Sequence, residues 1–255
     1  MGKIISFSNQ KGGVGKTTSC VNIAAQIANK CNKKVLMIDM DPQGNATSGL
    51  GLSKSKIKKT IYDIIIGNCA ADEAIIKTKF KNLSVIPANI DLAGAELELY
   101  NLDEKDENFT KIALDGVKNS YDYIFIDCPP SLGMLTVKAL SASDGVVIPM
   151  QCEFYSLEGM SQLLNTVKKI RQLYNPELQI VGILLTMYNG RLTLTNQVVA
   201  ELTKYYQDQL FKVPISRTVR LSEAPSYGEP ICYHDPYCKG ALEYAAVAKE
   251  LMLRI

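Results

Sequence analysis

Apolar residues along the chain fall into short continuous runs that alternate with longer segments in which apolar side chains recur every three or four positions. The short runs, rich in β-branched residues, predict strands at residues 4–8, 35–40, 83–87, 123–127, 145–149 and 180–186. The periodic segments predict helices at residues 17–30, 132–142, 157–174, 193–206 and 240–253. Strands that are apolar throughout are typical of parallel sheets, so the alternation predicts a doubly wound α/β fold whose mostly parallel sheet carries helices on both faces.

The chain is predicted to form a single domain over residues 1–255. Its length is sufficient to bury one core, and no internal repeat, low-complexity tract or linker rich in proline, glycine and serine marks a boundary. No apolar run approaches the roughly 20 residues that span a bilayer. Four lysines between residues 54 and 59 and six acids between residues 96 and 107 are interpreted as solvated surface.

Composition narrows the class of protein. Apolar residues make up 47% and charged residues 21%, which excludes a disordered, collagen-like or disulfide-scaffold chain. The net charge is only +2, so any surface that binds a polyanion must be local. Seven cysteines without a CxxC spacing and the lack of a signal peptide predict reduced thiols and a cytoplasmic protein. The single histidine, His234, excludes histidine-based triads and multi-histidine metal sites.

The strongest motif is the glycine-rich segment NQKGGVGKTT at residues 9–18, between the first predicted strand and helix. Its glycines allow the backbone N–H groups to curl around phosphates, and the helix N-terminus faces their charge. Gln10 stands where the pattern GxxxxGK[ST] has its first glycine, so the loop is a variant form. In the phosphoryl-transfer template Lys16 bridges the β- and γ-phosphates and Thr17 ligates Mg²⁺. The predicted nucleotide-binding residues of the loop are Lys11, Gly12, Gly13, Val14, Gly15, Lys16, Thr17 and Thr18.

Acidic residues end two predicted strands beside this loop. Asp39 and Asp41 lie two positions apart, which points both carboxylates to one side. Asp127 ends the strand at 123–127, the position of a carboxylate that holds Mg²⁺, through water. Each of the three could instead cap the turn that follows its strand.

Three segments together resemble the ParA/Soj partition ATPases: KGGVGKTT at residues 11–18, IDMDPQGNAT at 38–47 and FIDCPPS at 125–131. RLSEAPS at residues 220–226 extends the resemblance to nearly the whole chain. The resemblance implies a P-loop NTPase with a deviant Walker A motif, with ATP and Mg²⁺ as cofactors. It also implies weak intrinsic ATP hydrolysis that a partner protein and DNA stimulate.

The resemblance assigns roles to the charged residues of these motifs. Lys11 reaches across an ATP-sandwiched homodimer to the partner's ATP, and Asp41 orients the attacking water. With Lys16 these two form the expected catalytic set. Asp39 supports Mg²⁺ together with Thr17 and Asp127, and also supports a switch loop through residues 44–45. Residues 131–136 match a second nucleotide-responsive segment, and Glu153 is a candidate contact at the dimer face.

The resemblance also places a base pocket and a DNA-binding surface. The pocket is expected at Met187, Pro214, Ile215 and Ser216, and the DNA-binding arginines at Arg191, Arg217 and Arg220. Arg217 and Arg220 could instead pair with Glu223 or another carboxylate. Residues 189–190, Asn-Gly, directly before Arg191, depart from the family pattern.

The function implied is chromosome or plasmid segregation by a homodimer that binds DNA non-specifically and is stimulated by a ParB/Spo0J-type protein, with DnaA as a second partner. Such a protein is expected to be cytoplasmic and nucleoid-associated, without stable membrane association. Three alternatives remain. A MinD-like membrane-positioning ATPase needs a basic amphipathic C-terminal helix, whereas residues 240–255 carry two basic and two acidic residues. A nitrogenase-iron-protein-like reductase would use Cys128 or Cys152 as cluster ligands, and a non-enzymatic nucleotide-stabilised scaffold would not hydrolyse ATP.

Overall fold

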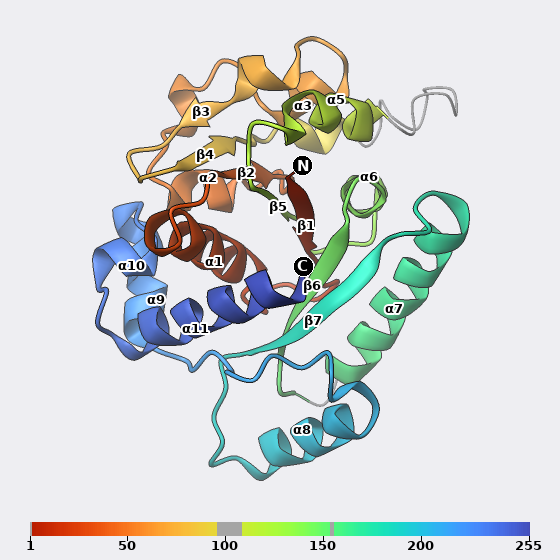
Figure 1. Cartoon of the computed structure of the whole chain (residues 1–255), viewed down its shortest axis with the longest axis vertical. Coiled ribbons are helices and arrows are strands. Elements are labelled where there is room, and N and C mark those ends of the chain that lie inside the picture. Colours follow the sequence, from red (N-terminus) through yellow and green to blue (C-terminus); the bar gives the residue numbers. More distant parts are fainter. Residues whose placement is uncertain (1, 96–108, 154–155) are drawn as a thin grey trace.

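The computed structural model describes residues 2–95, 109–153 and 156–255 and has a central sheet with the strand order β3-β4-β2-β5-β1-β6-β7 (Figure 1). All neighbouring strands are parallel except β3, which is antiparallel to β4. The strands are β1 (Lys3–Phe7), β2 (Val35–Asp39), β3 (Ile76–Lys77), β4 (Leu83–Ile86), β5 (Tyr123–Asp127), β6 (Gly145–Gln151) and β7 (Gln179–Thr186). All six predicted strands are confirmed. The two-residue β3 was missed because so short an element displays no alternation.

The long predicted helices are also confirmed, with ends that differ by at most two residues. They are α1 (Lys16–Lys30), α6 (Met134–Ser141), α7 (Ser156–Leu173), α8 (Thr193–Tyr206) and α11 (Lys239–Arg254). The sequence did not predict α2 (Asn45–Gly49), α3 (Ile61–Ile65), α5 (Phe109–Lys118), α9 (Val219–Glu223), α10 (Ile231–His234) or the 3₁₀ turns η1 (Lys54–Lys56), η2 (Ala71–Ala74) and η4 (Ala224–Tyr227). Most of these span about one helical turn, too short to show a helical period. The acidic stretch at 96–107 lies outside the described residues.

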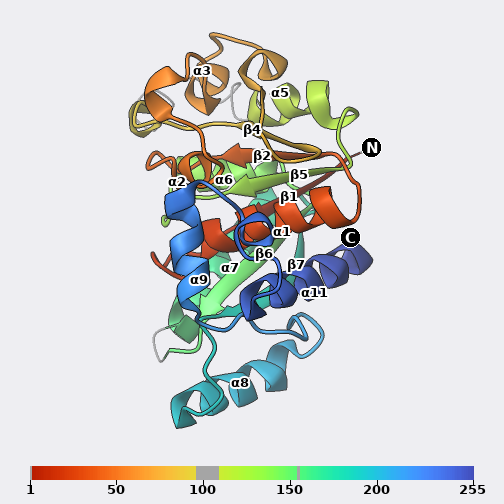
Figure 2. The same ribbon diagram turned by 90° about the vertical axis from the view of Figure 1, so that its left-hand side faces the viewer.

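Helices cover both faces of the sheet, as the doubly wound prediction requires. Alternate side chains of β1 point to opposite faces: Ile5 and Phe7 join a core with α1 and α11, whereas Ile4 joins a core with α3, α5 and α6. A third core lies between β6, β7, α7 and α8. Figures 1 and 2 show α8 at the opposite end of the molecule from α3 and α5. The layered arrangement brings the carboxyl ends of the parallel strands to one edge of the sheet.

The segment at residues 209–216 lies along the edge strand β7. The Ile183 amide donates to the carbonyl of Gln209 at 2.8 Å, and the Phe211 amide donates to the carbonyl of Ile183 at 3.0 Å. Further along, the Ile215 amide donates to the carbonyl of Leu185 at 2.8 Å. These bonds protect the edge of the sheet and fix residues 215–216 beside the end of β7.

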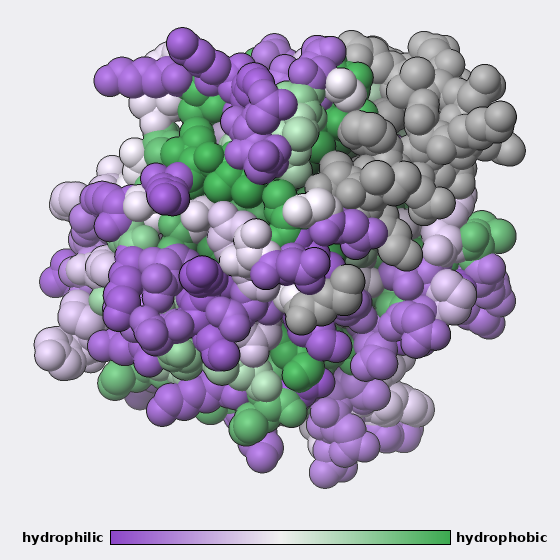
Figure 3. Space-filling model, turned by 45° about the horizontal axis from the view of Figure 1, so that its top comes forward, coloured by the Kyte–Doolittle hydropathy of each residue, from purple (hydrophilic) through white to green (hydrophobic). Residues whose placement is uncertain are grey.

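The outer surface is mixed in character. Figure 3 turns the end with α3 and α5 forward, and hydrophilic side chains cover much of this face, with a smaller hydrophobic area between them. Within the described parts of the chain, no helix combines the length and the apolar character that crossing a bilayer requires.

Candidate nucleotide site

The phosphate loop follows β1 and ends where α1 begins. Gly13 (φ 73°) and Gly15 (φ 80°) adopt the left-handed conformation that favours glycine. Neighbouring strand ends hold the loop from the side: the Thr186 hydroxyl donates to the carbonyl of Val14 at 2.7 Å, and Gln151 Nε2 donates to the carbonyl of Gly13 at 3.0 Å. No role was predicted for Gln151, because a glutamine at the end of a buried strand belongs to no motif. Side chains from the ends of β6 and β7 therefore help to hold the loop in this shape.

The two lysines of the loop differ in environment. Lys16 is buried, and its Nζ donates to the carbonyl of Lys11 at 3.0 Å. Burial lowers the pKa of Lys16, while the Asp127 carboxylate acts in the opposite direction. The Lys11 side chain is 38% exposed, and its ammonium pairs with the carboxylate of Glu153 beyond the end of β6. The Lys16 ammonium thus lies on the inner side of the loop, and the Lys11 ammonium lies on its outer side.

Asp39 and Asp127 are direct neighbours across β2 and β5, and both are fully buried. Asp39 Oδ2 accepts hydrogen bonds from the amide and the hydroxyl of Thr47, at 2.8 and 2.7 Å. Burial raises the pKa of Asp39 to about 6 despite these bonds. Burial and the adjacent Asp39 carboxylate raise the pKa of Asp127 well above its ordinary value, while the nearby Thr17 hydroxyl opposes the shift.

The environment of Asp127 fits a divalent cation. Its two buried carboxylate oxygens have no hydrogen bond of ordinary geometry from the described residues, although the Thr17 hydroxyl lies near enough to lower the pKa, and two adjacent buried carboxylates favour a positive charge between them and the loop. Those residues contain no group of three or more His, Cys, Asp and Glu side chains placed to form a complete metal cage. Mg²⁺ does not need one, because it commonly takes one or two carboxylates and completes its shell with phosphates and water.

The segment after β2 is tied to the strand end. Asp41 is 7% exposed, and its Oδ1 accepts from the Gln43 amide at 2.9 Å. Gly44 (φ 58°) then starts α2, and the Thr47 bonds to Asp39 hold that helix in place. Asp39 thus contacts α2 directly behind the predicted switch loop, and its predicted roles at the switch and at a metal stay predictions.

A cavity of about 270 Å³ opens beside the phosphate loop. Of the four residues predicted for a base pocket, Met187, Ile215 and Ser216 line it, and Pro214 does not. Sequence reasoning missed the far wall, which includes Leu221, Ser222, Pro225 and Tyr244. Three of these residues lie in the motif RLSEAPS at residues 220–226, which was given no role in the pocket, whereas Tyr244 belongs to none of the motifs.

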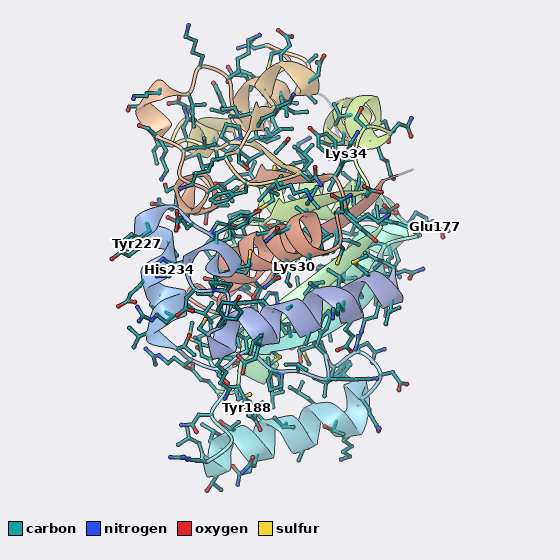
Figure 4. The ribbon with its side chains drawn as sticks, turned by 60° about the vertical axis from the view of Figure 1, so that its left-hand side comes forward. Lys30, Lys34, Glu177, Tyr188, Tyr227 and His234 are labelled. Carbon is teal, nitrogen blue, oxygen red and sulfur yellow. The ribbon has the colours of Figure 1, made fainter. Side chains whose placement is uncertain are left out.

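The turn η4, which contributes Pro225 to the cavity, ends in contacts with two other segments. The rings of Tyr227 and His234 lie together, with centroids 4.8 Å apart (Figure 4). Gly228 meets Gly51 backbone to backbone: a Cβ on Gly228 would lie 2.5 Å from the Cα of Gly51. The turn that lines the cavity is thereby packed against the segment that follows α2.

The three predicted arginines lie on neighbouring segments. Arg217 is exposed and borders the cavity, and the bridge between Tyr188 and Ser216 brings the loop of the exposed Arg191 alongside. Arg220 pairs with Glu223 at 3.3 Å and with Asp235 at 3.5 Å, so the alternative interpretation of an ion-paired arginine applies to this residue. Its exposed pairs contribute little stability and leave it accessible.

Comparisons with known proteins give the family. A family model described as an AAA domain matches residues 2–180. The sporulation initiation inhibitor protein Soj of Bacillus subtilis is 53% identical over 251 residues, 98% of each chain. The chromosome partitioning protein ParA of Myxococcus xanthus is 48% identical, over 100% of this chain and 89% of its own. This chain belongs to the ParA/Soj family of chromosome-partitioning ATPases.

Solved structures support the P-loop ATPase fold of this ParA/Soj protein. The Mycobacterium smegmatis structure described as cobyrinic acid a,c-diamide synthase with bound ADP and magnesium has a TM-score of 0.86 and 34% identity, covering 99% of this chain and 94% of that one.

The geometry also bears on the reductase and membrane-positioning alternatives. Burial raises the pKa of Cys128 to about 12 and of Cys152 to about 11, so both side chains are thiols in this structure. The apolar face of α11 packs against the core with α1 and is not free for a membrane.

Proposed function

We propose that this ParA/Soj ATPase binds ATP with Mg²⁺, forms a homodimer with ATP between the subunits, holds DNA non-specifically as a dimer and releases it on hydrolysis. The observation that carries the proposal is the placement of Lys11. Its ammonium contacts Glu153 on the outer side of the loop, while Lys16 occupies the inner side. A cation delivered from one subunit to the other's transferring phosphoryl group makes hydrolysis wait for assembly.

Different residues of the chain have different roles in the proposed hydrolysis. Lys16 binds the β- and γ-phosphates, and Asp41 orients the attacking water beside them. Thr17 and Asp127 hold Mg²⁺, with Asp39 supporting the site from the next strand. The bound cation supplies charge stabilisation for the phosphates. Loop amides between Gly12 and Gly15 keep the nucleotide in place.

DNA binding follows from dimerisation. The three arginines, Arg191, Arg217 and Arg220, offer roughly three phosphate contacts per subunit and roughly six per dimer. The slope of log affinity against log salt concentration steepens by about 0.9 for each phosphate neutralised. A monomer therefore binds DNA weakly and the dimer binds much more tightly. Nucleotide-gated dimerisation becomes nucleotide-gated binding to DNA.

The biological setting is proposed from the relatives. The relatives named Soj and chromosome partitioning protein ParA support a role in chromosome or plasmid segregation. A ParB/Spo0J-type protein is the expected stimulator of hydrolysis, DnaA is a second expected partner, and the nucleoid in the cytoplasm is the expected location.

A mixing experiment tests the in-trans role of Lys11. Lys11→Ala and Asp41→Ala subunits both retain the ATP pocket, and each pure variant should hydrolyse little ATP. In a mixed dimer, the ATP of the Lys11→Ala subunit has its own Asp41 and the partner's intact lysine. Random pairing makes about half the dimers mixed, each with one complete site, so phosphate release should recover to about a quarter of the wild-type rate.

The outcome separates the mechanisms. Recovery on mixing supports a lysine that acts across the interface, because neither subunit alone holds a complete site. A mixture as inactive as its components, with both variants still binding ATP, contradicts the in-trans role. Wild-type protein that releases no phosphate with DNA and a ParB-type partner present would favour the non-enzymatic scaffold.

A further inference from the structure

A carboxylate from the C-terminal helix occupies both hydrogen-bond donors of Ser216. Glu243 Oε2 accepts from the Ser216 amide at 2.8 Å, and Glu243 Oε1 accepts from its hydroxyl at 2.6 Å. The Glu243 side chain is 11% exposed, and Lys239, one turn earlier on α11, places its ammonium 3.7 Å from Oε1. The pairing joins residues 27 positions apart in the sequence, so it depends on the fold.

Ser216 is held in the wall of the cavity beside the phosphate loop. The preceding residue, Ile215, is bonded to β7 through its amide, and its carbonyl accepts from the Tyr188 amide at 2.9 Å. Figure 4 shows Tyr188 where the chain leaves the sheet near α11. With Glu243 on one side and β7 on the other, Ser216 has little freedom to turn.

The occupied donors matter because adenine and guanine differ in hydrogen-bonding character at C6. Adenine carries an amino group that donates, whereas guanine carries a carbonyl oxygen that accepts. A free amide or hydroxyl of Ser216 would donate to the carbonyl oxygen of guanine and favour guanine nucleotides. With both donors engaged, the free hydrogen-bonding group of the Ser216 main chain is its carbonyl oxygen, which receives no bond from the described residues. This oxygen can accept a hydrogen bond from an amino group and therefore favours adenine.

We propose that Glu243 is a positioning residue that sets the preference of this cavity for adenine over guanine nucleotides, by withdrawing the Ser216 donors from the base. The inference rests on the proposed binding of a nucleotide at this site. A carboxylate suits the task because it only accepts hydrogen bonds. A glutamine in its place would offer an amide N–H to the Ser216 hydroxyl and free that hydroxyl to donate toward the cavity.

Calorimetric titration with Mg²⁺–ADP and Mg²⁺–GDP provides the test. The wild type should bind ADP more tightly than GDP. Glu243→Gln should lower the ratio of the two affinities by about tenfold, the value of one hydrogen bond exchanged between competing bases. Glu243→Ala should lower it in the same direction. Lys239→Ala, which leaves both Ser216 bonds in place, is the matched control and should keep the wild-type ratio.

A second background isolates the hydroxyl. In Ser216→Ala protein, Glu243→Gln has no hydroxyl to release, so the ratio should move far less than in the wild type. A fall in both affinities by the same factor in Glu243→Gln indicates a merely structural role and overturns the inference. Wild-type protein that binds ADP but does not discriminate against GDP also overturns it. Wild-type protein that binds neither nucleotide overturns the proposed function itself.

Discussion

Replacing Thr47 by valine tests the network that fixes α2 to the end of β2. The Thr47 hydroxyl donates to Asp39 Oδ2 at 2.7 Å and accepts from the Ala88 amide at 3.0 Å, and Thr47 is fully buried. Valine has the same shape without the hydroxyl. The substitution therefore removes one bond to a carboxylate and leaves a buried amide without its partner.

The expected loss follows from these two bonds. A hydrogen bond to a charged group contributes about 1.5–3 kcal/mol, and an unpaired buried donor costs about 1–3 kcal/mol. We expect the free energy of unfolding to fall by about 3–5 kcal/mol, a large share of the roughly 5–15 kcal/mol that stabilises a domain.

The loss should also depend on pH. Burial raises the pKa of Asp39 from 3.8 to about 6, so the folded state holds this proton more tightly than the unfolded state does. The associated stability is complete below about pH 4 and is lost as the pH rises through about 6. Without the hydroxyl the ionised carboxylate loses a donor and its pKa rises further. The cost of Thr47→Val should therefore be larger at about pH 8 than at about pH 5.

Urea denaturation at both pH values measures the effect. Thr203→Val is a matched control, because that exposed hydroxyl donates only to a carbonyl within its own helix, and its effect should stay within about 0.5 kcal/mol. A cost for Thr47→Val below about 1 kcal/mol, or one equal at the two pH values, would refute the reasoning.

Three further predictions concern the site and its walls. Lys16→Ala removes the buried ammonium of the phosphate loop and should abolish ADP binding in calorimetry; binding within about tenfold of the wild type would contradict the assignment. Mg²⁺–ADP binding at about pH 6 should release protons, because burial raises the pKa of Asp39 to about 6 and also raises that of Asp127, while a bound cation favours both ionised carboxylates. Calorimetry in two buffers of different ionisation heat measures the number of protons released. A number of zero argues against the metal site. Gly228→Ala should cost about 2–5 kcal/mol in urea denaturation, since its Cβ would meet backbone at 2.5 Å in a left-handed conformation, whereas Gly159→Ala, with open space around it, should not destabilise the protein.

The positions of the glycine-rich loop and of the acids at the strand ends could be predicted because both depend on contiguous signals, while their roles toward a ligand stay predictions. The glycines between the first strand and helix allow the left-handed conformation that Gly13 and Gly15 adopt, and Asp39 and Asp127 meet because parallel strands end at a common edge. The same logic placed the main strands and long helices.

Contacts between remote segments escaped prediction. Lys11 and Glu153 are 142 positions apart, and Tyr244 reaches the cavity beside the phosphate loop from the last helix. Neither pairing follows a period or a motif. The family resemblance placed Pro214 in the pocket, yet Ile215 and Ser216 line the cavity and Pro214 does not. Such features depend on how helices dock, which local hydrophobic pattern does not encode.

Nucleotide-gated retention of DNA tests the central claim most directly. Purified Asp41→Ala protein, which should bind ATP without hydrolysing it, is applied to immobilised DNA of random sequence at one fixed salt concentration, with Mg²⁺ and either ATP or ADP. We predict retention with ATP alone, because only the ATP-bound dimer combines the arginines of two subunits. Equal retention with the two nucleotides, or no retention with ATP although ATP is bound, would contradict the account.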